Sequence, residues 1–106
     1  MESETRETLD ELYRIRERLL EVYESGGERV RRLRRIAAEA DPVIKRAVEL
    51  IDDEAERRWI VRNWACFREF INRHPPTKLV YRSSMNGAYE AVDTCIRLLE
   101  LRLRGK

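Results

Sequence analysis

The stretch VIKRAVELIDDEAERRWI, residues Val43–Ile60, decides how many helices the chain has, because neither Gly nor Pro interrupts it. Successive residues of an α-helix are rotated by about 100°, so apolar residues at helical spacing mark the face that becomes buried. The apolar stripe in the first half of this stretch lies roughly 150° around the helix from the stripe that begins at Trp59. One straight helix could not bury both stripes. We therefore predict a break at Asp52-Asp53, with Asp53 and Glu56 as a capping pair for the next helix.

Apolar residues recur at helical spacing through the rest of the chain, and Gly and Pro fall between the periodic segments. Asp41 followed by Pro42 is typical of an N-cap and a first helical residue, so this pair should start a separate helix. The expected helices cover roughly residues 3–24, 28–40, 42–51 and 53–74, and a last helix starts between 83 and 87. Residues 77–81 read as extended chain. The sequence thus predicts an all-α, single-domain bundle of about five helices over residues 1–106, with a short extended segment before the last helix.

The core is expected to form where the fourth and the last of these helices pack together, through Trp59, Trp64, Phe67, Phe70, Tyr89, Val92, Cys95, Ile96 and Leu99. Asn63 falls in the middle of the apolar face of the fourth helix. Because a buried amide must find hydrogen-bond partners, we expect Asn63 to fix the register with a neighbouring helix rather than to take part in chemistry.

The composition bounds the possible functions. The 106 residues suffice for one domain, and although 40% of them are charged, the net charge is only +2. There is therefore no global basic field of the kind that drives indiscriminate nucleic-acid binding, and any basic site must be local. No apolar run reaches the ~18 residues of a membrane span, no cationic apolar leader starts the chain, and the two cysteines read as reduced core thiols. We expect a cytoplasmic protein without a membrane role.

The local basic signal is RVRRLRR, residues Arg29–Arg35, which holds five arginines. Seven of the fourteen arginines elsewhere have an acid four positions earlier and are explained as solvated helix surface. Arg34, in contrast, has no acid three or four positions away, and Arg31 has only Glu28, which also pairs with Arg32, while Arg35 can reach Glu39. The apolar residues of this segment define the opposite, buried side, so Arg31, Arg34 and Arg35 are expected to point into water as a group of like charges.

Such a group favours an anion. We expect a non-catalytic interaction subunit, an accessory component of a nucleoprotein complex that contacts the phosphate backbone without reading its sequence. Arg31, Arg34 and Arg35 would be the main contacts, with Arg32 and Arg82 secondary, because Arg82 stands where free N–H groups at the start of the last helix favour negative charge. In the alternative, the arginines only keep the protein in solution or pair with the acidic first helix.

The first helix suggests a different function, a helix-mediated homo-oligomer or protein adaptor with no nucleic-acid role. One apolar seam follows heptad spacing, and a second stripe lies beside it, formed by Leu9, Tyr13 and Leu20 with Arg16 close by. The first seam could pack inside the domain, and the second against a partner chain, with Arg16 reaching an acid across the interface. Equally, the whole helix could be wrapped within its own domain, with Arg16 extending to solvent.

The sequence contains few residues at spacings typical of a catalytic site or a cofactor site. The spacing of Cys66, Cys95 and the single histidine, His74, matches no zinc site, and no glycine-rich phosphate loop is present. We therefore expect no metal, no cofactor and no catalytic residues.

One enzymatic pattern remains, in which Arg68 and His74 stand as Arg-x5-His. This resembles the Arg-x4–6-His signature of HEPN-type ribonucleases, which are small helical domains that often dimerise. The resemblance implies that His74 and Arg68 act on an RNA phosphate. It covers only a few residues, and it departs from the family at Glu69, where a neutral polar residue or Asp is usual, and at Pro75-Pro76, which end the helix directly after His74. A HEPN-like ribonuclease is the weaker alternative.

Overall fold

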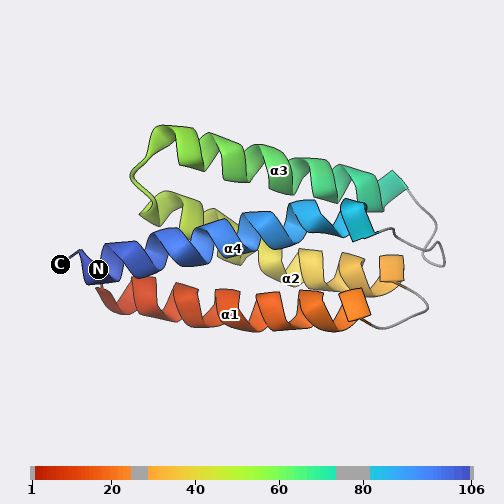
Figure 1. Cartoon of the computed structure of the whole chain (residues 1–106), viewed down its shortest axis with the longest axis horizontal. Coiled ribbons are helices and arrows are strands. Elements are labelled where there is room, and N and C mark those ends of the chain that lie inside the picture. The colour runs from red at the N-terminus through yellow and green to blue at the C-terminus, as the bar shows by residue number, and fades with distance from the viewer. Residues whose placement is uncertain (1, 25–28, 74–81, 106) are drawn as a thin grey trace.

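The described residues of the chain form four helices that run alternately up and down. The computed structural model describes the backbone of residues 2–24, 29–73 and 82–105, and every side chain in these ranges outside residues 82–85. The helices are α1 (Glu2–Glu24), α2 (Arg29–Leu50), α3 (Glu54–Arg73) and α4 (Arg82–Arg104). Figure 1 shows that consecutive helices are antiparallel and that the beginning and the end of the chain lie at the same end of the molecule. The all-α prediction is confirmed, with four helices in place of about five.

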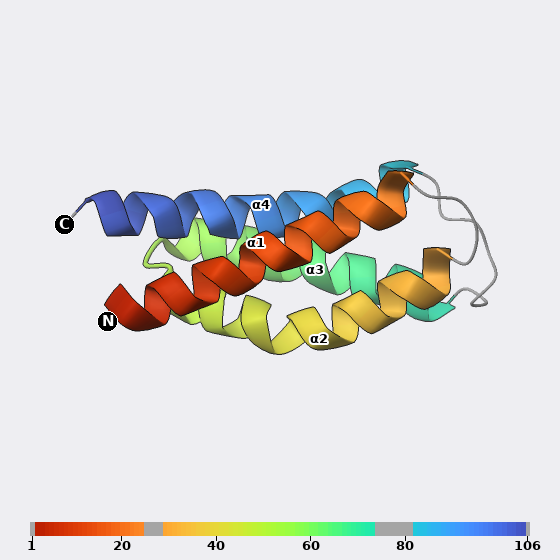
Figure 2. The same cartoon turned by 90° about the horizontal axis from the view of Figure 1, so that it is seen from below.

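The four helices form an elongated bundle, 45 × 23 × 19 Å. Each helix packs against its neighbours in chain order, and α4 closes the bundle by packing against α1 as well as α3. Across the diagonals α2 touches α4, whereas α1 and α3 make no contact among the described residues. Helix α3 therefore lies at the corner opposite α1, as the two views in Figures 1 and 2 also show.

The expected break at Asp41-Pro42 is wrong, because α2 continues through Pro42. A proline inside a helix removes one backbone hydrogen bond and costs about 3 kcal/mol. Here the buried stripe keeps the same phase on both sides of the proline, from Ala37 and Ala40 to Val43 and Ile44, and Pro42 itself is exposed. Packing along one continuous stripe thus outweighs the local cost. Figure 2 shows that the axis of α2 changes direction in its middle part, as an internal proline favours.

The expected break at residues 52–53 is confirmed. Helix α2 ends at Leu50 and α3 begins at Glu54. The backbone N–H of Glu56 donates to Asp53 Oδ1 at 3.0 Å, which is the N-cap contact that the sequence predicts. The change of phase between the two apolar stripes therefore becomes a change of direction between two helices.

The core is narrower on α3 than expected. Ile60, Trp64, Phe67 and Ile71 are buried there, but Trp59 is 40% exposed and Phe70 is only half-buried. On α4, Tyr89 is also only half-buried. The other expected core residues, all on α4, are buried as predicted: Val92, Cys95, Ile96 and Leu99.

Asn63 does not fix the register with another helix as expected. It is half-exposed, and its Nδ2 donates to the carbonyl oxygen of Trp59 at 2.8 Å, one turn earlier in α3. Helix α3 buries a stripe only about one residue wide per turn, so Asn63 and Trp59 fall on its flank.

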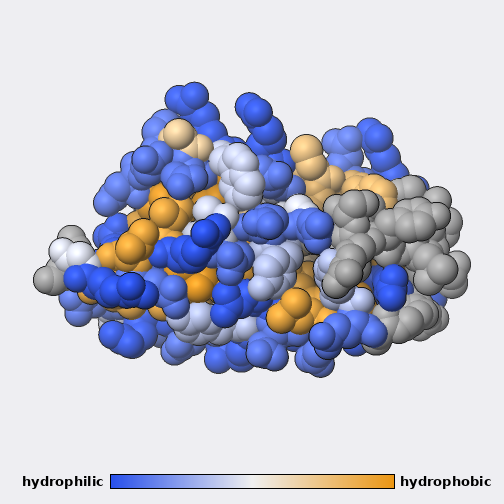
Figure 3. All heavy atoms as spheres, viewed as in Figure 1, coloured by the Kyte–Doolittle hydropathy of each residue, from blue (hydrophilic) through white to orange (hydrophobic). Residues whose placement is uncertain are grey.

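The face of the molecule seen in Figure 3 is mainly hydrophilic. Its hydrophobic patches lie mostly in the left half, around α4. The most exposed large apolar side chains of the described residues are Leu101, Val61, Trp59 and Leu20. No helix in the described part of the chain is both long and apolar enough to cross a membrane. The extended segment expected at residues 77–81 lies outside the described residues.

Candidate nucleic-acid interface

The arginine-rich segment forms the first two turns of α2. Val30 and Leu33 are completely buried and fix the rotation of the helix, so that Arg31 and Arg35 are exposed while Arg32 and Arg34 are half-buried. Figure 1 shows that this end of the bundle also holds the end of α1, the end of α3 and the start of α4. The arginine-rich start of α2 therefore lies at the same end of the bundle as three other helix ends.

Arg34 does not point into water as expected. Its Nε donates to the carbonyl oxygen of Ile71 at 3.0 Å, and its Nη2 donates to that of Asn72 at 3.4 Å. These carbonyls belong to the last turn of α3, where backbone oxygens lack partners within the helix and carry partial negative charge. Arg34 is thus a cap that joins α2 to α3. Arg102 of α4 caps the C-terminal end of α2 in the same way, because it donates to the carbonyl oxygen of Leu50.

Three other arginines meet at a hollow between α1 and α2. Arg18 comes from α1, and Arg32 and Arg35 come from α2. The hollow has a volume of about 180 Å³, and its remaining lining consists of Glu21, Val22 and Ile36. The carboxylate of Glu21 lines the hollow with the three guanidinium groups, and a second carboxylate, that of Glu39, pairs with Arg18, so a smaller excess of positive charge remains. Each guanidinium has several planar N–H donors.

The hydrogen-bond partner of Glu39 differs from the expected one. The sequence offers it to Arg35 on the same helix, but Arg18 reaches across from α1 and donates to its Oε1. This hydrogen bond is the main reason why the pKa of Glu39 lies below its usual value, and the charges of Arg18 and Arg35 add to the effect. Arg18 is the residue that sequence reasoning missed. Its partner lies 21 positions away, so a search at spacings of three and four could not find it.

Arg82 is the first residue of α4, so its backbone lies at the arginine-rich end of the bundle. Its side chain lies outside the described part of the structure. Arg31 is exposed, on the turn before the hollow. Of the five residues expected to contact nucleic acid, the structure thus brings Arg32 and Arg35 to one hollow, exposes Arg31, and ties Arg34 to α3.

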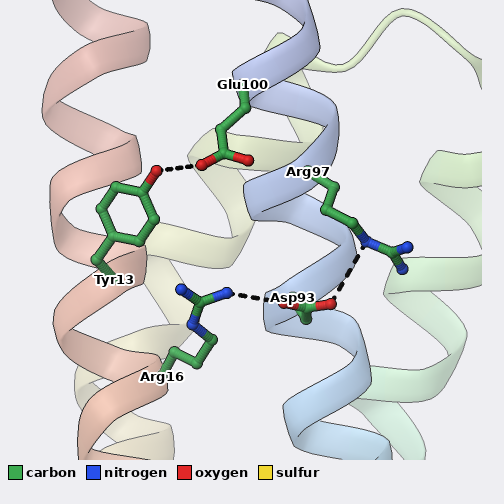
Figure 4. Close-up of polar contacts among 5 residues, drawn as sticks. All are labelled: Tyr13, Arg16, Asp93, Arg97 and Glu100. Carbon is green, nitrogen blue, oxygen red and sulfur yellow. Dashed lines mark hydrogen bonds and ion pairs between the residues drawn. The ribbon is translucent and has the colours of Figure 1, made fainter.

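The residues expected at an oligomer interface lie mainly against α4 of the same chain. Figure 4 shows Tyr13 and Arg16 extending from α1 toward α4. The Tyr13 hydroxyl donates to Glu100, and Arg16 forms an ion pair with Asp93 at 2.8 Å. Leu9 is only 6% exposed, whereas Leu20 is 36% exposed. The acid that Arg16 was expected to find in a partner chain is therefore present within its own bundle.

This α1–α4 seam continues as a small network. Arg97 forms a second ion pair with Asp93 at 3.4 Å, and the Arg16 guanidinium lies 5.5 Å from the centre of the Tyr13 ring. The hydrogen bond to Glu100 is the main cause of the raised pKa of Tyr13, because removal of the phenolic proton would end the bond and place two negative charges side by side.

Three of the residues that the sequence singled out for catalytic or metal chemistry, Arg68, Cys66 and Cys95, lie in the described part of the structure. Arg68 forms an ion pair with Asp41 of α2 at 3.1 Å, and His74 lies outside the described residues. Burial raises the pKa of the Cys95 thiol to about 12, while Cys66 is exposed on α3. The described residues hold no group of three or more His, Cys, Asp or Glu that could bind a metal.

Comparisons with known proteins give no assignment of the chain. Neither a family model, nor a curated protein, nor a solved structure matches it.

Proposed function

We propose that this protein is a non-catalytic, cytoplasmic subunit that binds the phosphate backbone of a nucleic acid, as an accessory component of a nucleoprotein complex. The contact surface is the arginine face, which consists of Arg31 and the three arginines of the hollow, Arg18, Arg32 and Arg35. It differs from the expectation based on sequence by the inclusion of Arg18 and by the structural role of Arg34.

The observation that carries the proposal is the convergence of Arg18, Arg32 and Arg35 from two helices on one hollow of about 180 Å³. A phosphate group accepts hydrogen bonds from several planar donors at once, and guanidinium groups match this geometry. Contacts to phosphate oxygens position the backbone of a nucleic acid and carry no sequence information directly.

The position of α4 supports the same surface. Its first residue, Arg82, lies at the arginine-rich end of the bundle, where free backbone N–H groups of a helix start also favour an anion. Arg82 is therefore a secondary contact. The net charge of +2 confines binding to this surface, since the protein as a whole exerts little attraction on a polyanion.

The test measures binding of a labelled 20-base duplex of random sequence, and of the matching single strand, over a series of salt concentrations. In the variant Arg31→Gln with Arg35→Gln, we expect the affinity to fall at least tenfold and the slope of log K against log salt to fall by about 2, because two phosphate contacts are lost. The matched control is Arg6→Gln with Arg14→Gln, which removes the same charge from exposed positions of α1. Equal losses in both variants, or no loss in the first, would refute the proposal.

A further inference from the structure

A groove runs along the contact between α2 and α3. Two hollows form it, one of about 310 Å³ and one of about 380 Å³. Val48 of α2 and Val61 of α3 line both hollows, so the two are continuous. Because α2 and α3 are antiparallel (Figure 1), the groove extends from Asp41, in the middle of α2, to Glu54, at the start of α3.

The floor of the groove is apolar. In the first hollow, the 310 Å³ one, Ile44 and Trp64 are buried, Val48 is half-buried, and Val61 is 52% exposed. The indole N–H of Trp64 already donates to Asp41 at 2.7 Å, so the tryptophan offers the groove an apolar surface. An apolar ligand that covers Val48 and Val61 would remove exposed apolar surface from water, which is favourable.

The charged groups on the rim of the first hollow balance one another. Asp41 is already paired with Arg68 at 3.1 Å. Lys45 and Glu49, both exposed on α2, carry opposite charges on the same rim. This end of the groove therefore has no excess of positive charge.

The second hollow, the 380 Å³ one, has such an excess. Arg57, Arg58 and Arg62 line it together with Glu54, and Glu54 forms an ion pair with Arg58 at 4.0 Å. Asp53, four positions before Arg57, is the N-cap of α3, and no acid stands three or four positions from Arg62. In the described part of the chain neither Arg57 nor Arg62 forms an ion pair. Two guanidinium groups at this end can therefore receive an anion.

The size of the groove favours a small ligand. Ligand sites have volumes of roughly 300–1,000 Å³ and combine an apolar lining with a few placed polar groups. A stable protein–protein contact needs about 800 Å² from each partner, which is more than a few apolar side chains between two helices provide. Single-stranded nucleic acid binds by stacking its bases on aromatic faces, but Trp64 is only 6% exposed.

We infer that the groove between α2 and α3 binds a small anionic amphiphile, a molecule with an unbranched apolar tail and one carboxylate or sulfate head. The tail lies along Val48 and Val61, and the head pairs with Arg57 and Arg62. In the opposite orientation the head would lie beside Glu49 and would be repelled by a like charge.

The ligand comes from solution rather than from a bilayer. The acids on the rim of the groove, Glu49 and Glu54, are exposed and would repel an anionic membrane surface. The inference does not rest on the proposed function, because the hollow of Arg18, Arg32 and Arg35 lies between α1 and α2 and shares no residue with the groove.

The first test titrates the protein with decanoate at pH 7.5, below the concentration at which decanoate forms micelles. The methyl signals of Ile44, Val48 and Val61, observed by NMR, are expected to shift and to saturate together. Decyltrimethylammonium has the same tail and the opposite charge, and it should bind at least tenfold more weakly. Equal affinities for the two probes, or decanoate shifts that leave these methyl groups unchanged, would overturn the inference.

The second test reverses the charge at the head of the groove. In Arg57→Glu with Arg62→Glu, the affinity for decanoate should fall at least tenfold, and that for decyltrimethylammonium should rise at least threefold. A gain for the cationic probe cannot come from damage to the fold. The matched control, Arg6→Glu with Arg14→Glu, makes the same change of net charge at exposed positions of α1 and should alter neither affinity more than twofold. Equal changes in the two variants would show that only the overall charge matters and would contradict the assigned site.

The third test examines the tail and the source of the ligand. Val61→Ser should weaken decanoate binding at least fivefold, whereas Val61→Leu should keep it within twofold, because only the first change removes apolar surface from the floor. Flotation with phosphatidylglycerol vesicles should leave the protein unbound. A protein that binds these vesicles but not decanoate would overturn the inference in favour of a membrane lipid.

Discussion

The seam between α1 and α4 and the seam between α2 and α3 close the bundle in different ways. On the α1–α4 side, Tyr13 and Arg16 cover an apolar interior with hydrogen-bonded partners on the facing helix. On the α2–α3 side, an open hollow of about 310 Å³ remains, with an apolar floor that includes Val48, Val61 and Ala65. The polar ties of this second seam are concentrated at Asp41 and at Arg34.

The comparison teaches that α3 packs mainly against α4 and is joined to α2 by a few discrete polar contacts. Asp41 accepts a hydrogen bond from the indole Nε1–H of Trp64 at 2.7 Å. It also forms an ion pair with Arg68 at 3.1 Å. Arg34 joins α2 to the last turn of the same helix. The helix buries one narrow stripe, which half-buried residues such as Asn63 and Arg68 flank, and it leaves its outer face exposed.

The largest expected effect comes from that buried stripe. Ile60 is completely buried, and Ile60→Ala is expected to lower the free energy of unfolding by about 3 kcal/mol, because it leaves a cavity beneath α3. Its neighbour Val61 is 52% exposed, so Val61→Ala should cost less than about 0.5 kcal/mol. Urea unfolding followed by circular dichroism measures both. Similar losses of stability in the two variants would contradict the assignment of Ile60 to the buried face and of Val61 to the exposed face of α3.

The boundaries of α2 and α3 and the contacts between these helices differ in how well the sequence predicts them. The break before α3 could be predicted because two apolar stripes differ in phase and because Asp53 is a good cap. At Pro42 the residue type predicts the start of a new helix, but the buried apolar stripe of α2 keeps its phase across the proline, and the helix continues. The contacts of Arg34 could not be predicted, since its acceptors are backbone carbonyls 37 and 38 positions away. Pairing rules along one helix say nothing about helix ends that meet in space.

A smaller effect is expected from the tie at Asp41. Asp41→Ala should lower the free energy of unfolding by about 2 kcal/mol, because the Trp64 indole N–H loses its acceptor and Arg68 loses its ion pair. The matched control is Glu69→Ala, which removes an exposed ion pair within α3 and should cost about 0.5 kcal/mol or less. Chemical unfolding compares the two. If Asp41→Ala costs no more than the control, the α2–α3 seam does not depend on this tie.

On the α1–α4 seam, Tyr13→Phe should cost about 1 kcal/mol through the lost hydrogen bond to Glu100. Because the pKa of Tyr13 is raised in the folded protein, its contribution is fully present below the usual tyrosine pKa and is lost as the pH rises through the raised value. The difference in stability between the native chain and Tyr13→Phe should therefore shrink above pH ~10. Unfolding curves at neutral and alkaline pH measure this, and a difference that grows with pH would contradict it.

The smallest perturbation is chemical labelling, which leaves the fold intact. At pH 8 a thiol reagent should modify Cys66 quickly, because it is exposed on α3. Cys95 should react only after unfolding, because it is completely buried and its pKa is raised to about 12. Mass spectrometry after short labelling identifies the modified residue. Fast labelling of Cys95 in the folded protein would show that the α4 core opens readily.

The most direct test of the proposed phosphate site is an NMR titration with a short duplex, observed through the Nε–Hε signals of the arginine side chains. The account predicts that Arg18, Arg32 and Arg35 shift together and saturate with the duplex, while Arg34 and the arginines of α3 stay in place. Shifts spread evenly over all arginines, or confined to α3, would contradict the assignment of the hollow between α1 and α2.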